Sequence, residues 1–104
     1  MKNKIEVSAI IPTYERKECL KDLLESIFRS NYPRKKMEII VVDDNSNEPY
    51  EEIKEGIPSV KFLKNKESKW ASRCRNIGAK VSKGKYLLFI DDDNLLDEGC
   101  ISEL

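Results

Sequence analysis

Acidic residues follow two apolar segments of the sequence at the point where each segment ends. Three aspartates, Asp91–Asp93, come directly after the apolar run 86–90, and a pair, Asp43–Asp44, follows the apolar run 37–42. Adjacent carboxylates repel one another, and a hard divalent cation relieves that repulsion. Two buried strands that each end in carboxylates therefore predict one cleft that holds a cation together with a ligand of that cation.

The triplet itself suggests how the carboxylates divide their roles. Residues two apart in an extended segment point the same way, so Asp91 and Asp93 are expected to act together while Asp92 faces elsewhere. Mg²⁺ or Mn²⁺ commonly takes one or two protein carboxylates and completes its coordination with phosphate oxygens and water. The alternative is an acidic loop that caps a following helix. Because Asp97 and Glu98 already serve that helix, metal or ligand binding is preferred.

The pair Asp43–Asp44 admits a structural and a functional role. One carboxylate could accept backbone N–H bonds in the turn-rich loop Asn45–Asn47. The other could accept a ring N–H of a base or a sugar hydroxyl, since buried polar groups of a ligand need partners. We assign Asp44 to the ligand and Asp43 to the loop.

Residues Pro12–Glu15 follow the first apolar segment, 5–11. They form either a strand-to-helix turn with Thr13 as a helix cap, or a ligand loop in which Tyr14 stacks on a planar ring. No glycine lies between residues 5 and 31. A phosphate-cradling glycine loop is therefore absent, and a metal ion is the obvious means of neutralising a diphosphate.

The elements that must position these residues alternate between strand and helix. Strands are expected at 5–11, where Pro12 should end the strand, and at 37–42, 60–63 and 86–90. Helices are expected at 16–30, 50–54 and 70–82, with a last one from about 97. This alternation predicts an α/β fold of three layers, with a mainly parallel sheet of order 3-2-1-4. The carboxyl ends of its strands would bring residues 12–15, 43–44 and 91–93 to one crevice.

Composition narrows the class of protein. The 104 residues fit one domain, and 19 basic residues balance 19 acidic ones, so no global field recruits nucleic acid or an anionic membrane. The odd number of cysteines, the absence of CxxC and the absence of histidine argue against a zinc site and for reduced, partly buried thiols. No segment has the length of a membrane span, and the first residues do not resemble a signal peptide. The expected location is cytoplasmic.

Four motifs, in matching order and spacing, resemble family 2 glycosyltransferases. They are Val7–Tyr14, Ile39–Ser46, Arg75–Gly78 and Gly84–Asp93. The resemblance covers nearly the whole chain and implies that 1–104 is the N-terminal, nucleotide-binding part of a GT-A fold, which is a Rossmann-like half. It also implies transfer of a sugar from a nucleotide-diphospho-sugar, UDP- or GDP-linked, to an unidentified acceptor hydroxyl with Mn²⁺ or Mg²⁺.

The resemblance assigns the base-binding side of the site. Pro12, Tyr14 and Glu15, with Thr13 among them, resemble the loop that contacts the base, and Asp44 resembles the carboxylate that reads it. Glu15 stands where the family often has asparagine, which leaves the identity of the base open.

The resemblance also assigns the diphosphate side. Asp91, Asp92 and Asp93 resemble the DxD motif of the family. Asp91 and Asp92 would lie near the ribose and diphosphate, Asp93 would be the principal metal ligand, and Asp91 would share the metal. Arg75 and Asn76 resemble the helix motif beside the donor.

The resemblance includes no catalytic base. In the family this carboxylate lies well beyond the DxD motif, and the sequence ends eleven residues after Asp93. A general base must lie within hydrogen-bond reach of the acceptor hydroxyl, and no residue here matches it. A piece truncated after the DxD motif is thus expected to bind nucleotide and metal but to transfer sugar poorly, and membrane association of a longer enzyme stays open.

Three other interpretations remain at this point. Receiver domains also bind Mg²⁺ through an acidic pair after a strand, but their acidic strand comes first, whereas 42 residues precede Asp43 here. Haloacid-dehalogenase-like phosphatases use Asp-x-Asp after an early strand, and Asn94-Leu95 fits their continuation badly. The third interpretation is a binding fragment without catalysis.

Overall fold

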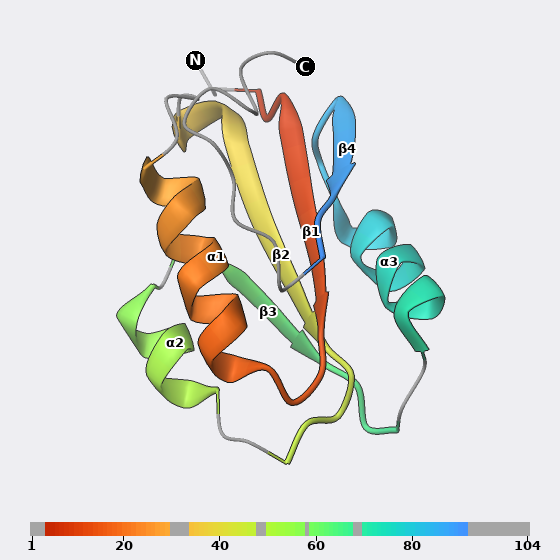
Figure 1. Cartoon of the computed structure of the whole chain (residues 1–104). Helices are drawn as coiled ribbons and strands as arrows, with labels where there is room; N and C mark the ends of the chain where they lie inside the picture. The colour runs from red at the N-terminus through yellow and green to blue at the C-terminus, as the bar shows by residue number, and fades with distance from the viewer. Residues whose placement is uncertain (1–3, 30–33, 48–49, 58, 68–69, 92–104) are drawn as a thin grey trace.

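The computed structural model describes residues 4–29, 34–47, 50–57, 59–67 and 70–91. Within them, four parallel strands form one sheet in the order β3-β2-β1-β4 (Figure 1). The strands are β1 (Val7–Thr13), β2 (Met37–Asp43), β3 (Lys61–Lys64) and β4 (Tyr86–Phe89). The helices are α1 (Lys17–Arg29), α2 (Glu51–Gly56), α3 (Trp70–Val81) and a short 3₁₀ turn, η1 (Arg34–Lys36). The predicted α/β class and strand order are confirmed.

Two hydrophobic cores lie on opposite faces of the sheet, because side chains alternate along each strand. Odd-numbered residues of β1 and β2 pack against the apolar stripe of α1, together with Ile53 of α2. Even-numbered Ile40 and Val42 of β2 pack against Cys74 and Ile77 of α3. The sheet is therefore the middle of three layers, with α1 and α2 on one side and α3 on the other (Figure 1).

The prediction that Pro12 ends the first strand is wrong, since β1 continues to Thr13. The Ile90 N–H donates to the Ile10 carbonyl at 3.1 Å, whereas the Thr13 carbonyl accepts from the Asp44 N–H at 2.9 Å. Even-numbered residues of β1 thus bond toward β4 and odd-numbered ones toward β2. Pro12 faces the β4 side beyond Phe89, the last residue of β4. Its missing N–H therefore removes no ladder bond.

Close contact at a glycine sets the position of α3. A Cβ added to Gly78 would lie 2.5 Å from Cγ2 of Ile10, so only glycine lets the helix lie this close to β1. The helix expected from residue 97 falls outside the described residues. Among those that are described, no helix has the length and apolar character needed to cross a membrane.

Candidate functional site

The carboxyl edge of the sheet gathers residues from three of its strands. Asp44 follows β2 directly, and its N–H donates to the carbonyl of Thr13 at the end of β1. Asp91 follows β4, whose Phe89 pairs with Ile10. Asp44 continues the even-numbered side of β2, and Asp91 continues the side of Phe89, so both lie on the face that α3 covers. The fold thus places these two carboxylates at one edge and on one face.

Asp43 and Asp44 have different environments, as their positions on opposite sides of β2 require. Asp43 is 4% exposed, and its Oδ1 accepts the backbone N–H of Ser46 at 3.1 Å. It therefore closes the loop after β2. Asp44 is half-buried, and its Oδ1 accepts the Asn65 side-chain amide at 3.1 Å.

Asn65 connects Asp44 to a buried thiol on α3. Its backbone N–H donates to the Asp43 carbonyl at 2.9 Å, and its side-chain nitrogen also lies 3.4 Å from the Cys74 Sγ. Burial, together with the negative charge of Asp44, raises the pKa of the Cys74 thiol to about 11. The thiol is therefore neutral, so the Asn65 amide and the Cys74 thiol are both uncharged neighbours of the Asp44 carboxylate. Of the two described cysteines, both free, Cys74 is buried, whereas Cys19 is exposed.

Glu15 links the loop after β1 to the loop after β2. Its N–H donates to Ser46 Oγ at 2.7 Å, and its Oε1 accepts the Asn47 N–H at 2.6 Å. Glu15 and Asn45 both have positive φ, 54° and 68°, a conformation that costs a non-glycine residue energy unless its surroundings hold it. Here the two reciprocal bonds hold it. Glu15 thus ties two loops together, and its predicted contact with a ligand stays a prediction.

Thr13 and Tyr14 face different ways. The hydroxyls of Thr13 and Tyr50 share a hydrogen bond of 3.1 Å, and the Tyr50 hydroxyl accepts the Arg16 N–H, also at 3.1 Å. The Thr13 side chain is therefore buried on the side of α1 and α2, away from Asp44. Tyr14 is half-exposed, which leaves its ring accessible for stacking. No motif in the sequence indicated Tyr50, because its partner lies 37 residues away.

Arg75 of α3 lies beside Asp91. Its Nη2 is 3.7 Å from Asp91 Oδ1, and both side chains are partly exposed. Arg73 and Asn76 lie on the other side of the helix, as predicted, where they line a shallow hollow with Ile77 and Lys80. Of the two arginines, Arg75 is thus the one that joins the acidic edge.

The oxygen donors suit a hard cation that takes few protein ligands and completes its shell with phosphate and water. Asp91 is the member of the triplet that the structure describes, and its carboxylate is two-thirds exposed. Asp92 and Asp93 lie outside the described residues. Within the described part of the chain, no group of three or more His, Cys, Asp or Glu side chains could enclose a metal. A cation here would therefore depend on Asp91, the aspartates after it and a bound ligand.

The family model for glycosyl transferase family 2 matches residues 8–104. The chain is 36% identical to a poly(ribitol-phosphate) beta-N-acetylglucosaminyltransferase, TarP, of Staphylococcus aureus, over 95% of this chain and 32% of that protein. It superposes on S. aureus TarS 1–349 in complex with UDP-GlcNAc with a TM-score of 0.89 and 25% identity, covering 95% of this chain and 30% of that one.

A third match concerns the fold alone. The mannosyltransferase PcManGT of Pyrobaculum calidifontis, in complex with GDP-Man and Mn²⁺, superposes with a TM-score of 0.79 at 24% identity, over 89% of this chain and 29% of that one. The chain spans about a third of the length of each of these proteins. The match of this family model to residues 8–104 excludes the receiver and phosphatase interpretations. The chain belongs to glycosyl transferase family 2.

Proposed function

We propose that this chain is the donor-binding part of a glycosyltransferase that moves a sugar from a nucleotide-diphospho-sugar to an acceptor hydroxyl with the help of Mn²⁺ or Mg²⁺. The observation that carries the proposal is the shared placement of Asp44 and the Arg75–Asp91 pair. Asp44 follows β2, Asp91 follows β4 and Arg75 lies in α3. All three lie at the carboxyl edge of the sheet, on the face that α3 covers. That edge is where open parallel sheets bind nucleotides.

Asp44 is the proposed reader of the base. An ionised carboxylate has about four acceptor positions, and the Asn65 amide uses one of them on Oδ1. The ring N–H of uracil or guanine can donate to another, whereas cytosine has no ring N–H to donate. Tyr14, which is half-exposed in the loop after β1, would stack on the base or ribose. UDP or GDP should therefore bind in preference to CDP.

Asp91, with Asp92 and Asp93 after it, is the proposed diphosphate side. A bound cation would supply the positive charge that offsets the diphosphate and the departing nucleotide. Asp91 and Asp93 are the proposed metal ligands, and Arg75 adds a fixed positive charge next to Asp91. No residue of this chain is proposed as the catalytic base, so donor binding without efficient transfer is expected from these 104 residues.

The donor and the acceptor class follow from the relatives only as proposals. TarP and TarS are named for poly(ribitol-phosphate) substrates, and TarS is known in complex with UDP-GlcNAc. We therefore take UDP-GlcNAc as the first donor to test and a polyol-phosphate hydroxyl as the first acceptor. The cytoplasm, where nucleotide-sugars are made, is the proposed location.

The test is calorimetric titration of the chain with UDP, GDP and CDP, each with and without Mn²⁺. We expect UDP or GDP to bind more tightly than CDP, and Mn²⁺ to increase that affinity. Asp44→Asn should weaken UDP binding about tenfold with or without metal, because an anionic acceptor is lost. Asp93→Ala should remove only the effect of Mn²⁺. Binding that ignores the metal and both substitutions would disprove the proposed site.

A further inference from the structure

The register of β4 is only weakly specified by its own sequence. Every residue of the run Tyr86–Ile90 is apolar, so a slip of one position exchanges apolar side chains within the run and brings a charged residue, Lys85 or Asp91, in only at its ends. Three of the four residues of β4 are also exposed, with Tyr86 at 55%, Leu87 at 44% and Phe89 at 46%. Leu88 packs against the first core, and Ile90, directly after β4, belongs to that core at 4% exposure. Hydrophobic burial therefore favours the observed register through Leu88 and Ile90 alone, while the other side chains of the run contribute little.

This choice matters for the proposed donor site. In the observed register Phe89 lies beside Ile10, and Asp91 lies on the α3 face within 3.7 Å of Arg75. A slip of one residue would move Asp91 by about 3.3 Å along the strand and turn its carboxylate to the opposite face. Contacts beyond the apolar side chains Leu88 and Ile90 are therefore expected to help fix the position of β4.

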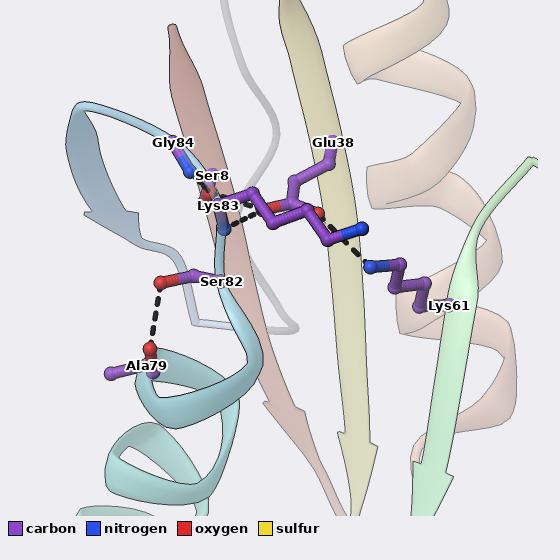
Figure 2. Close-up of polar contacts among 7 residues, drawn as sticks. All are labelled: Ser8, Glu38, Lys61, Ala79, Ser82, Lys83 and Gly84. Carbon is purple, nitrogen blue, oxygen red and sulfur yellow. Dashed lines mark hydrogen bonds and ion pairs between the residues drawn. The ribbon is translucent and has the colours of Figure 1, made fainter. Parts of the chain in front are cut away.

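A polar cluster at the other end of the strands holds the connection between α3 and β4 (Figure 2). Glu38 of β2 is at its centre, with its side chain only 9% exposed. Its Oε2 accepts the Ser8 hydroxyl at 2.6 Å and also the backbone N–H of Lys83. Its Oε1 lies 3.3 Å from Lys61 Nζ, and the Gly84 N–H donates to Ser8 Oγ at 2.8 Å. The consecutive backbone N–H groups of Lys83 and Gly84 thus donate to side chains of β2 and β1, respectively.

The fit around Gly84 makes this attachment specific to one residue. A Cβ at position 84 would lie 2.4 Å from Ser8 Oγ and 2.6 Å from the Ser8 backbone nitrogen. Any other residue of the connection, shifted into this place, would therefore clash with β1. Two residues later the ladder begins, with the Tyr86 N–H donating to the Glu6 carbonyl at 2.8 Å.

We propose that Ser8 and Glu38 are positioning residues of the donor site, which set the register of β4 and thereby place Asp91 beside Arg75. The proposal rests on the proposed function, because it assigns these residues a role through the acidic end of β4. Neither residue touches the ligand edge. Asp44 and the loop after β1 belong to strands whose pairing does not depend on β4, so the base side should stay intact when the cluster is broken.

The first experiment separates the two sides of the site. UDP affinity is measured with and without Mn²⁺ for the native chain, Ser8→Ala and Glu38→Gln. In both variants we expect the affinity without metal to stay within about twofold, and the gain from Mn²⁺ to fall about tenfold, the usual cost of disturbing a residue behind a metal ligand. Lys61→Met, which leaves both bonds to Oε2 in place, should keep most of the gain.

Loss of stability alone must not explain the result. Ile53→Val in α2 removes one buried methyl far from β4 and serves as the matched control, since it should lower stability by about 1 kcal/mol and leave the Mn²⁺ gain unchanged. The proposal is overturned if Ser8→Ala and Glu38→Gln keep the native gain. It is equally overturned if they lose metal-free affinity by the same factor.

Amide hydrogen exchange tests the register without any ligand. In the native chain the amides of Lys83 and Gly84 should be protected as well as those of Tyr86 and Ile90. In Ser8→Ala and Glu38→Gln, Tyr86 and Ile90 should exchange at least about tenfold faster, while the Asp44 amide between β1 and β2 keeps its protection. Unchanged protection in the variants, or fast exchange of Lys83 and Gly84 in the native chain, would refute the proposal even if the chain binds no nucleotide.

Discussion

At the scale of single residues, the candidate site depends on polar side chains that hold other polar side chains. Asn65 places one amide group between the carboxylate of Asp44 and the thiol of Cys74. The amide of Asn65 thereby orients the carboxylate of Asp44. Arg75, the described cation at this edge that contacts the acidic triplet, lies instead against Asp91. The charges of the site are thus divided between a base side and a diphosphate side.

The raised pKa of Cys74 gives a prediction at this scale. The thiolate is the reactive form of cysteine, and a buried thiol with a pKa of about 11 has very little of it at neutral pH. We expect iodoacetamide at pH 8 to alkylate the exposed Cys19 and to leave Cys74 unmodified, as measured by peptide mass spectrometry. In denaturant the two should react alike. Equal labelling in the native chain would contradict the described environment of Cys74.

At the scale of elements, the periodic sequence pattern predicted the helices and strands, whereas features that depend on tertiary contacts were not predicted. The apolar stripe of α1 and the apolar runs of β1 and β2 predicted these elements to within two residues, because periodic burial is a local property of the chain. The end of β1 was wrongly predicted at Pro12, because a proline interrupts a strand only where its missing N–H faces a paired neighbour. That side is decided by β4, more than seventy residues later.

Contacts between loops could not be read from the sequence for the same reason. Thr13, Glu15 and Asp44 were correctly expected at the carboxyl edge, since strand order dictates where strand ends meet. That Glu15 bonds to the loop after β2, and Thr13 to Tyr50, depends on side-chain directions that local spacing does not encode. The ligand roles given to Pro12–Glu15, Arg75 and the triplet remain predictions.

The link between α2 and the loop after β1 gives a prediction for an element. Tyr50→Phe keeps the packing of the ring but removes the acceptor of the Arg16 N–H and the partner of Thr13. Because buried polar groups then lose a partner, the free energy of unfolding should fall by about 1–3 kcal/mol in urea titration. Metal-free UDP affinity should fall with it, whereas the gain from Mn²⁺ should not change. A variant as stable as the native chain would show that this contact contributes little.

At the scale of the whole molecule, the net charge is zero, so the electrostatic contributions to stability that can be identified are local ones. Glu38 is the clearest case. Burial raises the pKa of its carboxyl, but the hydrogen bonds from Ser8 and Lys83 and the charge of Lys61 outweigh burial, so the net pKa lies below the usual 4.5. A lowered folded-state pKa stabilises the protein above the unfolded-state pKa, and that stabilisation is lost as pH falls through the folded-state value.

The native chain should therefore lose stability as the pH drops below about 4.5, the ordinary pKa of glutamate. Glu38→Gln should be less stable at pH 7 and should lose less on acidification, because the group that titrates is gone. Urea midpoints between pH 7 and pH 3 measure both slopes, with Glu52→Gln, an exposed partner of Lys17, as the control. Parallel slopes for the native chain and Glu38→Gln would show that this carboxyl does not contribute.

The close approach of Gly84 to β1 also determines which amino acids this position can tolerate. A side chain of any size at position 84 would overlap Ser8, whereas a Cβ at Gly56 would meet nothing within 4 Å. Gly84 lies in the connection between α3 and β4, whereas Gly56 is the last residue of α2, so a substitution at position 84 would disturb the attachment of β4 and one at position 56 would meet no neighbour. Related sequences should therefore vary at position 56 and keep glycine at position 84.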